Sequence, residues 1–232
     1  DIDATPDGKA VIYHNYLENN RNALLFDLTR LIGYDQGIAS HPSGGAAGGN
    51  AAATDGELVW CHSTNGKPHF IHRGDGRPFG AGRAQWRRNV FIPDGPVTSM
   101  DAKRDAAGRR LLYVAQQGEK PGVLVLNGDD AKKIGELAVA GVDAIAVGDE
   151  ALYLLHPDGA GHRVISAAAM EAGVPMPPLR RALALPEGVQ AVDMERDSRG
   201  RLYVVDAAGR RVLRFDDGDR IPDLVIGKAG RQ

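Results

Sequence analysis

The sequence predicts an all-β repeat protein, and three observations carry this prediction. Thirty glycines and thirteen prolines are spread along the 232 residues rather than concentrated, which fits many turns between short strands. Short apolar runs alternate with these turns, whereas helix-forming composition is scarce. A strand, a polar turn and an aromatic strand follow one another in a pattern that occurs five times. Internal repeats decide the architecture of a chain, so this pattern sets the fold class.

The repeat is easiest to follow through its aromatic residue, which lies inside an apolar strand after a turn that ends near Gly. The aligned aromatics are Tyr13, Trp60, Tyr113, Tyr153 and Tyr203, separated by 47, 53, 40 and 50 residues. A period of about 40–50 residues with strand composition is typical of β-propeller blades.

Further apolar strands follow each aromatic strand. The third strands are expected at 23–27, 69–72, 122–126, 163–166 and 211–215, and weaker fourth strands at 89–92, 135–139, 181–185 and 223–226. A four-stranded sheet cannot bury both of its faces alone, so neighbouring sheets must cover one another. We therefore expect a single β-propeller domain of about five four-stranded blades, with approximate limits 1–45, 46–95, 96–140, 141–186 and 187–232.

Two segments depart from the strand pattern. The alanine-rich stretch 166–172 predicts a helix of about two turns, stopped by Gly173 and Pro175. The stretch from Gly33 to Gly49 is rich in Gly, Ala and Ser, and it predicts a long loop with at most a short edge strand.

The last unit, Val192–Asp216, resembles a repeat of the NHL family, and the first unit, with Thr5–Lys9, resembles the related YVTN-type repeat. This resemblance implies a propeller, commonly with six blades. Five units therefore indicate either a five-bladed ring or a six-bladed ring with one blade outside the chain. The ending Asp223–Lys228 resembles the outer strand that precedes another repeat, which favours a fragment or domain of a longer protein. Propellers host binding, scaffolding, lyase and hydrolase functions.

Composition excludes several partners. Lys and Arg number 28 and Asp and Glu 30, so the net charge of −2 leaves no electrostatic footprint for nucleic acid or an anionic membrane. No apolar run is long enough for a membrane span.

Cys61 is the single cysteine, and the chain opens with Asp1 and without a signal peptide. The compartment is not readable from this start; an extracellular or periplasmic location is favoured over a cytoplasmic one.

Two sets of residues at repeated positions are candidate sites. The first is a carboxylate set that several blades would contribute to one axis, where a hard cation such as calcium could bind: Asp3, Asp101, Asp143 and Asp193. The favoured alternative is that each Asp caps its own turn. The second set follows the aromatic strands and varies from blade to blade, as a binding face requires: Tyr16, His62, Gln116, His156 and Asp206. The alternative is that these are ordinary solvated loop residues.

Catalytic signals are weak. His69 and His72 are three residues apart on an expected strand, so they point to opposite faces and make a poor ligand pair. A zinc lyase or hydrolase with His62 and His156 as ligands or bases stays an alternative. Cys61 lies in an apolar strand and is expected in the core.

One arginine-rich segment, 73–88, contains Trp86 and Arg87, a composition typical of interface hot spots and of solvated loops alike. Regular repeats without a strong catalytic motif predict a non-catalytic binding or scaffolding propeller that contacts protein partners or other domains of the same protein. The alternatives are the metal-dependent lyase or hydrolase and a carbohydrate-binding propeller, in which Trp86 and Tyr16 stack on sugar rings.

Overall fold

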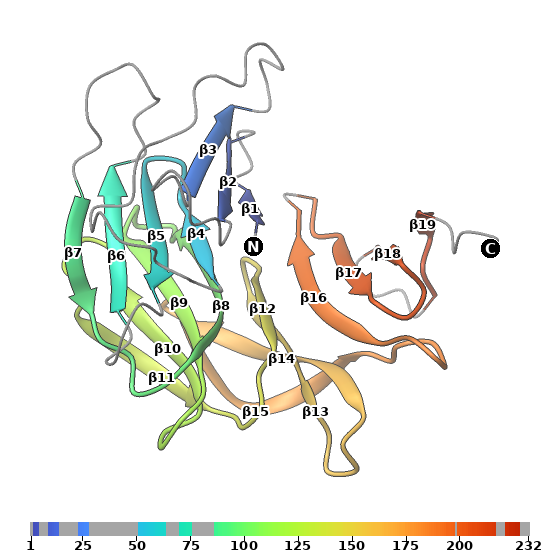
Figure 1. Ribbon diagram of the computed structural model, residues 1–232. Helices are drawn as coiled ribbons and strands as arrows, with labels where there is room; N and C mark the ends of the chain where they lie inside the picture. Colours follow the sequence, from blue (N-terminus) through green and yellow to red (C-terminus); the bar gives the residue numbers. More distant parts are fainter. Residues whose placement is uncertain are drawn as a thin grey trace.

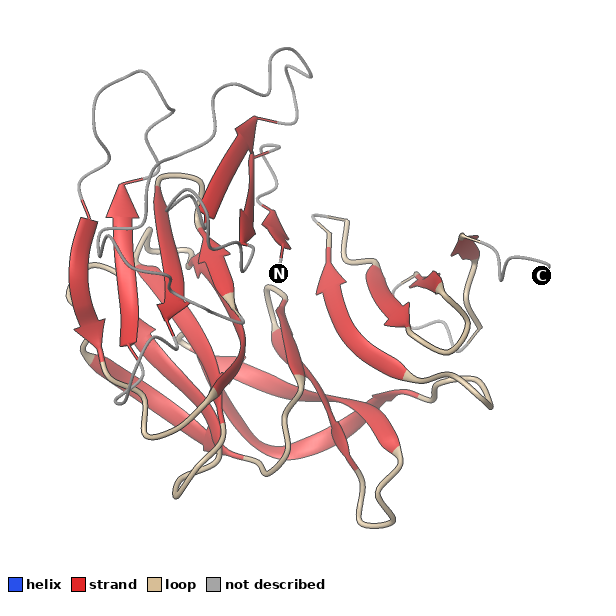
Figure 2. Cartoon of the chain, in the orientation of Figure 1, coloured by secondary structure: helices blue, strands red, loops and turns tan. Residues whose placement is uncertain are grey.

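The computed structural model describes residues 2–4, 9–13, 23–27, 51–63, 70–75, 86–197, 199–216 and 221–227. Every regular element within these ranges is a β-strand, which confirms the all-β prediction (Figures 1 and 2). None of these ranges holds a helix with the length and apolar character needed to cross a bilayer.

The strands form five antiparallel sheets in chain order. The N-terminal sheet has three strands in the described residues: β1 (Ile2–Ala4), β2 (Lys9–Tyr13) and β3 (Ala23–Asp27). The first blade has β4 (Ala52–Thr54), β5 (Leu58–Ser63), β6 (Phe70–Asp75) and β7 (Trp86–Phe91). The second blade has β8 (Val97–Arg104), β9 (Arg110–Gln116), β10 (Gly122–Asn127) and β11 (Lys133–Ala138). The third blade has β12 (Ala144–Val147), β13 (Ala151–Pro157), β14 (Arg163–Glu171) and β15 (Val174–Leu183). The fourth blade has β16 (Ala191–Arg196), β17 (Leu202–Asp206), β18 (Arg211–Phe215) and β19 (Leu224–Ile226).

The sheets follow one another around a common centre, as propeller blades do (Figure 1). Each sheet's first strand is its inner strand, and these inner strands contact one another in chain order: β1 with β4, β4 with β8, β8 with β12, and β12 with β16. The propeller prediction is confirmed, but the blade count was wrong. The structure has four four-stranded blades rather than about five, because the N-terminal sheet has only three described strands. The loop expected at 33–49 lies outside the described residues.

The five aligned aromatics all lie on the second strand of their sheet, as the repeat predicts. The helix expected at 166–172 is wrong, because this stretch lies in β14 and its turn to β15. β14 pairs with β13 on one side and β15 on the other, and Ala168 is fully buried in the core. Two ladders of backbone hydrogen bonds and this tight packing outweigh the intrinsic helix preference of alanine.

The core lies between blades rather than within them. Trp60 and Ile71 of the first blade pack with Leu112 of the second. A second cluster joins the second blade to the third, and a third cluster joins the third blade to the fourth. Each sheet thus buries its faces against its neighbours, as expected for units that cannot bury a core alone.

Candidate binding face

The two ends of the ring differ. At one end the inner strands begin and the second strands end, because Val97 pairs with Gln116 and Ala191 pairs with Asp206. We call this end the mouth face. The opposite end, which we call the turn face, carries the tight turns between inner and second strands that begin at Asp105 and Asp197.

The turns of the turn face close on themselves. Asp105 Oδ1 accepts hydrogen bonds from the N–H groups of Ala107 and Arg109, at 3.0 and 2.9 Å. Asp197 does the same for Arg199 and Arg201, at 2.9 and 3.0 Å. In each turn the last arginine also pairs with the same aspartate. The carboxylate therefore satisfies the turn's own backbone.

On the mouth face, buried side chains tie one segment to another. Gln116 Oε1 accepts a hydrogen bond from Asp94 N–H at 3.2 Å, and Gln116 Nε2 donates to the carbonyl oxygen of Lys120 at 3.0 Å. Asp206 Oδ1 accepts from the N–H groups of Gln190 and Gly209, both at 3.1 Å. Both residues thus join the linker before an inner strand to the loop after a second strand, and we call them the mouth clamps.

Electrostatics strengthens the Asp206 clamp. Burial opposes its ionisation, but the N–H groups of Gly209 and Gln190 and the Arg211 guanidinium outweigh burial and lower the pKa of Asp206. Arg211 Nε donates to Asp206 Oδ2 at 2.8 Å. The clamp is therefore a charged, fully bonded group at ordinary pH.

The other predicted mouth residues differ in position. His156 is half-buried, and its Nδ1 lies 2.9 Å from the carbonyl oxygen of Pro157, which makes Nδ1 the donor. Its Nε2 lies 2.9 Å from Ser166 Oγ, so both ring nitrogens have partners. His62 is fully buried. It stands two residues after its aromatic, whereas Gln116, His156 and Asp206 each stand three residues after theirs. Tyr16 lies outside the described residues. A ligand-binding role for this set stays a prediction.

Two cavities open on the mouth face, and the first lies at the channel mouth. It has a volume of about 410 Å³ and is lined by Thr98, Asp143, Arg163 and residues 190–192, from the starts of three inner strands and of β14. Arg163 Nε pairs with Asp143 Oδ2 at 2.7 Å, and both side chains are partly exposed. The mouth thus offers a cation and an anion side by side.

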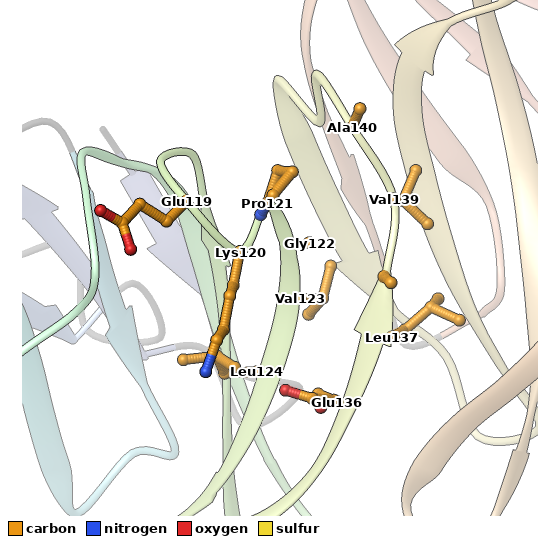
Figure 3. Close-up of a pocket in the computed structure, with 11 residues that line it drawn as sticks. Glu119, Lys120, Pro121, Gly122, Val123, Leu124, Glu136, Leu137, Val139 and Ala140 are labelled. Carbon is orange, nitrogen blue, oxygen red and sulfur yellow. The ribbon is translucent and has the colours of Figure 1, made fainter.

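The second cavity, of about 440 Å³, lies at the end of the second blade (Figure 3). Lys120 and Pro121 come from the loop before β10, and Glu136 and Leu137 from β11. Its floor is aliphatic and its rim is charged, a mixture that suits a peptide better than a small apolar ligand.

The third cavity, of about 420 Å³, lies on the fourth blade and is mainly apolar, with Arg211 as its charged residue. The mouth clamps touch all three cavities. Gln116 bonds Lys120 of the second cavity, and Asp206 bonds Gln190 of the first and Arg211 of the third.

The four predicted aspartates do not occupy equivalent positions in the strand registers of their sheets. Asp101 pairs with Tyr113, but the residues opposite the aromatics of the other three blades are Ala53, Ala146 and Glu195. Asp143 precedes its inner strand and pairs with Arg163 on the mouth face. The side chain of Asp3 on β1 is outside the description. Among the described residues no three His, Cys, Asp or Glu side chains are grouped to hold a metal ion. A calcium or zinc site stays a prediction.

Acidic side chains nevertheless lie close together along the inner strands. Asp101 is buried and accepts hydrogen bonds from Ala102 N–H and from Val147 N–H of the third blade, both at 2.6 Å. Burial raises the pKa of Asp101 to about 6. Burial, followed by the nearby Asp101 charge, raises the pKa of Glu195 well above its ordinary value. Sequence reasoning missed Glu195, which only the strand register reveals.

The remaining predicted residues can be placed briefly. Trp86 and Arg87 begin β7, where their backbone pairs with Gly74 and Arg73. Their side chains are outside the description, so the proposed interface there stays a prediction. Cys61 is confirmed as a core residue, because it is fully buried and burial raises the pKa of its thiol.

No protein-family model matches the chain, so the resemblance to NHL repeats stays a prediction. No curated protein sequence matches it either. Solved structures do match. The β-propeller domain of Cps50 (Swd1) from Myceliophteria thermophila aligns with a TM-score of 0.59 and 10% identity, over 98% of this chain and 73% of that one.

Two further structures show the same likeness. YCF48 bound to a D1 peptide aligns with a TM-score of 0.54 and 10% identity, over 97% of this chain and 66% of that one. Regucalcin from Agrobacterium tumefaciens, a calcium-binding protein, aligns with a TM-score of 0.54 and 12% identity, over 97% of this chain and 72% of that one. The chain thus spans just under two thirds of the YCF48 chain. At these identities the likeness shows the β-propeller fold alone.

Proposed function

We propose that this propeller is a non-catalytic binding domain that holds a segment of a protein partner on its mouth face. The observation that carries the proposal is that two cavities of about 410 and 440 Å³ open on this face and that a third, of about 420 Å³ on the fourth blade, reaches it at Arg211; each has a lining residue fixed by a mouth clamp. The turns of the opposite face satisfy their own backbone.

A protein segment suits this face better than a small metabolite does. The cavities are spread from the second blade to the fourth, and their linings mix aliphatic residues with separate charges. An extended peptide can place apolar and charged side chains in successive cavities. Among the fold neighbours, YCF48 was solved with a peptide, which supports this class of partner without identifying it.

A binding role also fits the state of the reactive side chains. The Cys61 thiol is buried, and its raised pKa keeps it protonated. Both ring nitrogens of His156 are engaged, so using it as a metal ligand or base requires breaking its bond to Ser166.

The test is selection of linear peptides from a phage-displayed random library on the immobilised chain, followed by affinity measurement on variants. Arg163→Ala removes the exposed cation of the channel mouth, and we expect it to weaken a selected peptide about tenfold or more.

Arg109→Ala is the matched control, because Arg109 pairs with Asp105 on the turn face and is similarly exposed. We expect its affinity to stay within about twofold of the unmodified chain. Enrichment of no peptide above the bare support, or an equal loss in both variants, contradicts the proposal.

A further inference from the structure

The loop between β9 and β10, residues 117–121, is held against the linker before β8. Gln117 N–H donates to the carbonyl oxygen of Pro96 at 2.9 Å, and Gln116 Nε2 donates to a carbonyl oxygen within the loop at 3.0 Å. The two backbones also touch, because a Cβ atom added to Gly95 would lie 1.8 Å from the Gln117 carbonyl oxygen. The loop therefore has a fixed position before any ligand arrives.

Lys120 stands on this loop as an exposed cation. The cations that line the other two cavities are already paired, Arg163 with Asp143 at 2.7 Å and Arg211 with Asp206 at 2.8 Å. Within the part of the chain that the structure describes, no carboxylate forms an ion pair with the Lys120 ammonium group. A ligand can therefore pair with Lys120 without breaking an existing ion pair.

The surface beside Lys120 is aliphatic (Figure 3). The lining residues of the second cavity that keep accessible apolar surface are Pro121, Ala138, Val139 and Ala140. The first and third of these are half-buried, and the two alanines are exposed. An aliphatic side chain of a ligand can lose contact with water on this surface.

Two carboxylates also lie at the rim of the second cavity, but neither neutralises Lys120. Glu136 pairs with Lys133, three residues before it. In Figure 3 the Glu119 side chain points away from β10 and β11, whereas the Lys120 side chain extends toward Leu124. The Lys120 ammonium group is therefore the unpaired charge beside the strands that line this cavity.

We infer that the second cavity selects an acidic and aliphatic segment of the partner: an Asp or Glu carboxylate pairs with Lys120, and an aliphatic side chain within three residues of it packs on Pro121 and Val139. This inference rests on the proposed function and adds the chemistry of the bound segment. An exposed ion pair alone contributes little, because water competes for both charges. Packing of the aliphatic side chain excludes water beside the pair and adds a contribution that depends on shape.

The test begins with the peptides that the immobilised chain selects from the phage-displayed random library. We expect Asp or Glu within three residues of Leu, Ile or Val at a higher frequency than in the unselected library. One selected peptide with this acidic and aliphatic pair is then synthesised. Its dissociation constant is measured on the unmodified chain and on variants at constant ionic strength.

Lys120→Glu replaces the unpaired cation by an anion, and we expect it to weaken this peptide about tenfold or more. A second form of the peptide, with Lys in place of its acidic residue, should recover most of the loss on this variant. Lys132→Glu is the matched control, because it changes the net charge equally and the Lys132 side chain is 82% exposed in the turn between β10 and β11. That turn lies beside the start of β9, on the turn face, so we expect a change within about twofold.

A third form of the peptide, with Ala in place of its aliphatic residue, should bind the unmodified chain about fivefold more weakly or worse. An unchanged affinity of this form overturns the inference. Peptides that lose affinity in Arg163→Ala but lack the acidic and aliphatic pair, or that keep their affinity in Lys120→Glu, overturn it and leave the proposed function in place. Equal losses in Lys120→Glu and Lys132→Glu overturn it as well, because they report net charge alone. Enrichment of no peptide overturns both the inference and the proposed function.

Discussion

The mouth face and the turn face are built from the same repeat, yet they satisfy their backbones in different ways. On the turn face, Asp105 and Asp197 each bond the turn that contains them. On the mouth face, Gln116 and Asp206 bond segments that are distant in sequence. The turn face is therefore locally closed, whereas the mouth face has loops held at a few points with cavities between them.

This difference explains why mouth residues vary from blade to blade. Gln116, His156 and Asp206 stand three residues after their aromatics, and each bonds a different set of groups. A turn of fixed geometry selects one residue type, namely Asp. A clamp between loops of different length can be formed by several residue types. Variation at this position thus reflects several ways of fixing the loops, and the cavities between the loops carry the proposed binding role.

The largest expected effect is that of removing a mouth clamp. Asp206→Ala leaves the Gln190 and Gly209 amides and the Arg211 guanidinium without their buried acceptor. We expect the free energy of unfolding, measured with urea, to fall by about 2–4 kcal/mol. Asp223→Ala is the control, because Asp223 pairs with Arg214 near the surface and its loss should lower the free energy of unfolding far less than Asp206→Ala does. Equal losses would remove the distinction between clamps and surface pairs.

The next effect concerns the channel between the two faces. Burial raises the pKa of Asp101 to about 6, from an ordinary value of 3.8, so the folded chain binds this proton more tightly than the unfolded chain. The resulting stabilisation is present below about pH 4 and is lost as the pH rises through about 6. We expect this contribution to be on the order of 3 kcal/mol.

Asp101→Asn tests this pH dependence through the slope of the free energy of unfolding against pH. Stability of the variant should fall less between pH 4 and pH 7 than that of the unmodified chain, because one of three carboxyl groups with a raised pKa, namely Asp101, Asp193 and Glu195, is gone. Chemical denaturation across this range at constant ionic strength gives both slopes. Parallel curves would show that Asp101 does not titrate there.

The smallest effect is expected on the turn face. Asp197→Ala removes the cap of one self-contained turn whose amides are close to water, so we expect a loss of about 1 kcal/mol. Asp197→Asn keeps an acceptor oxygen for the turn and should recover most of that loss. A loss as large as that of Asp206→Ala would mean that the two faces do not differ in the way described.

The sequence predicted the blade strands well, because each aromatic lies inside a short apolar run between turn residues. Its errors have identifiable physical causes. The alanines of 166–172 have helix preference, but hydrogen bonds to β13 and β15 override it. The N-terminal unit lacks an apolar run for a fourth strand, and the structure describes only three strands there.

The site was harder to predict than the fold. Counting from each aromatic back to an Asp crosses turns of different length, so Asp101 was aligned with Asp193 although the register aligns it with Glu195. His62 was grouped with Gln116, although it lies one residue nearer its aromatic on the same strand. Arg163 and Lys120 carry no motif, and only the convergence of loops on one face makes them candidates.

Amide hydrogen exchange of the chain, with and without a selected peptide, tests the central claim most directly. We expect slower exchange in the mouth-face segments 117–121, 158–162 and 184–190, because the bound segment covers the loops around the cavities. The turn-face segments 105–109 and 197–201 should exchange at unchanged rates. Protection confined to the turn face, or spread equally over both faces, would contradict a binding role for the mouth face.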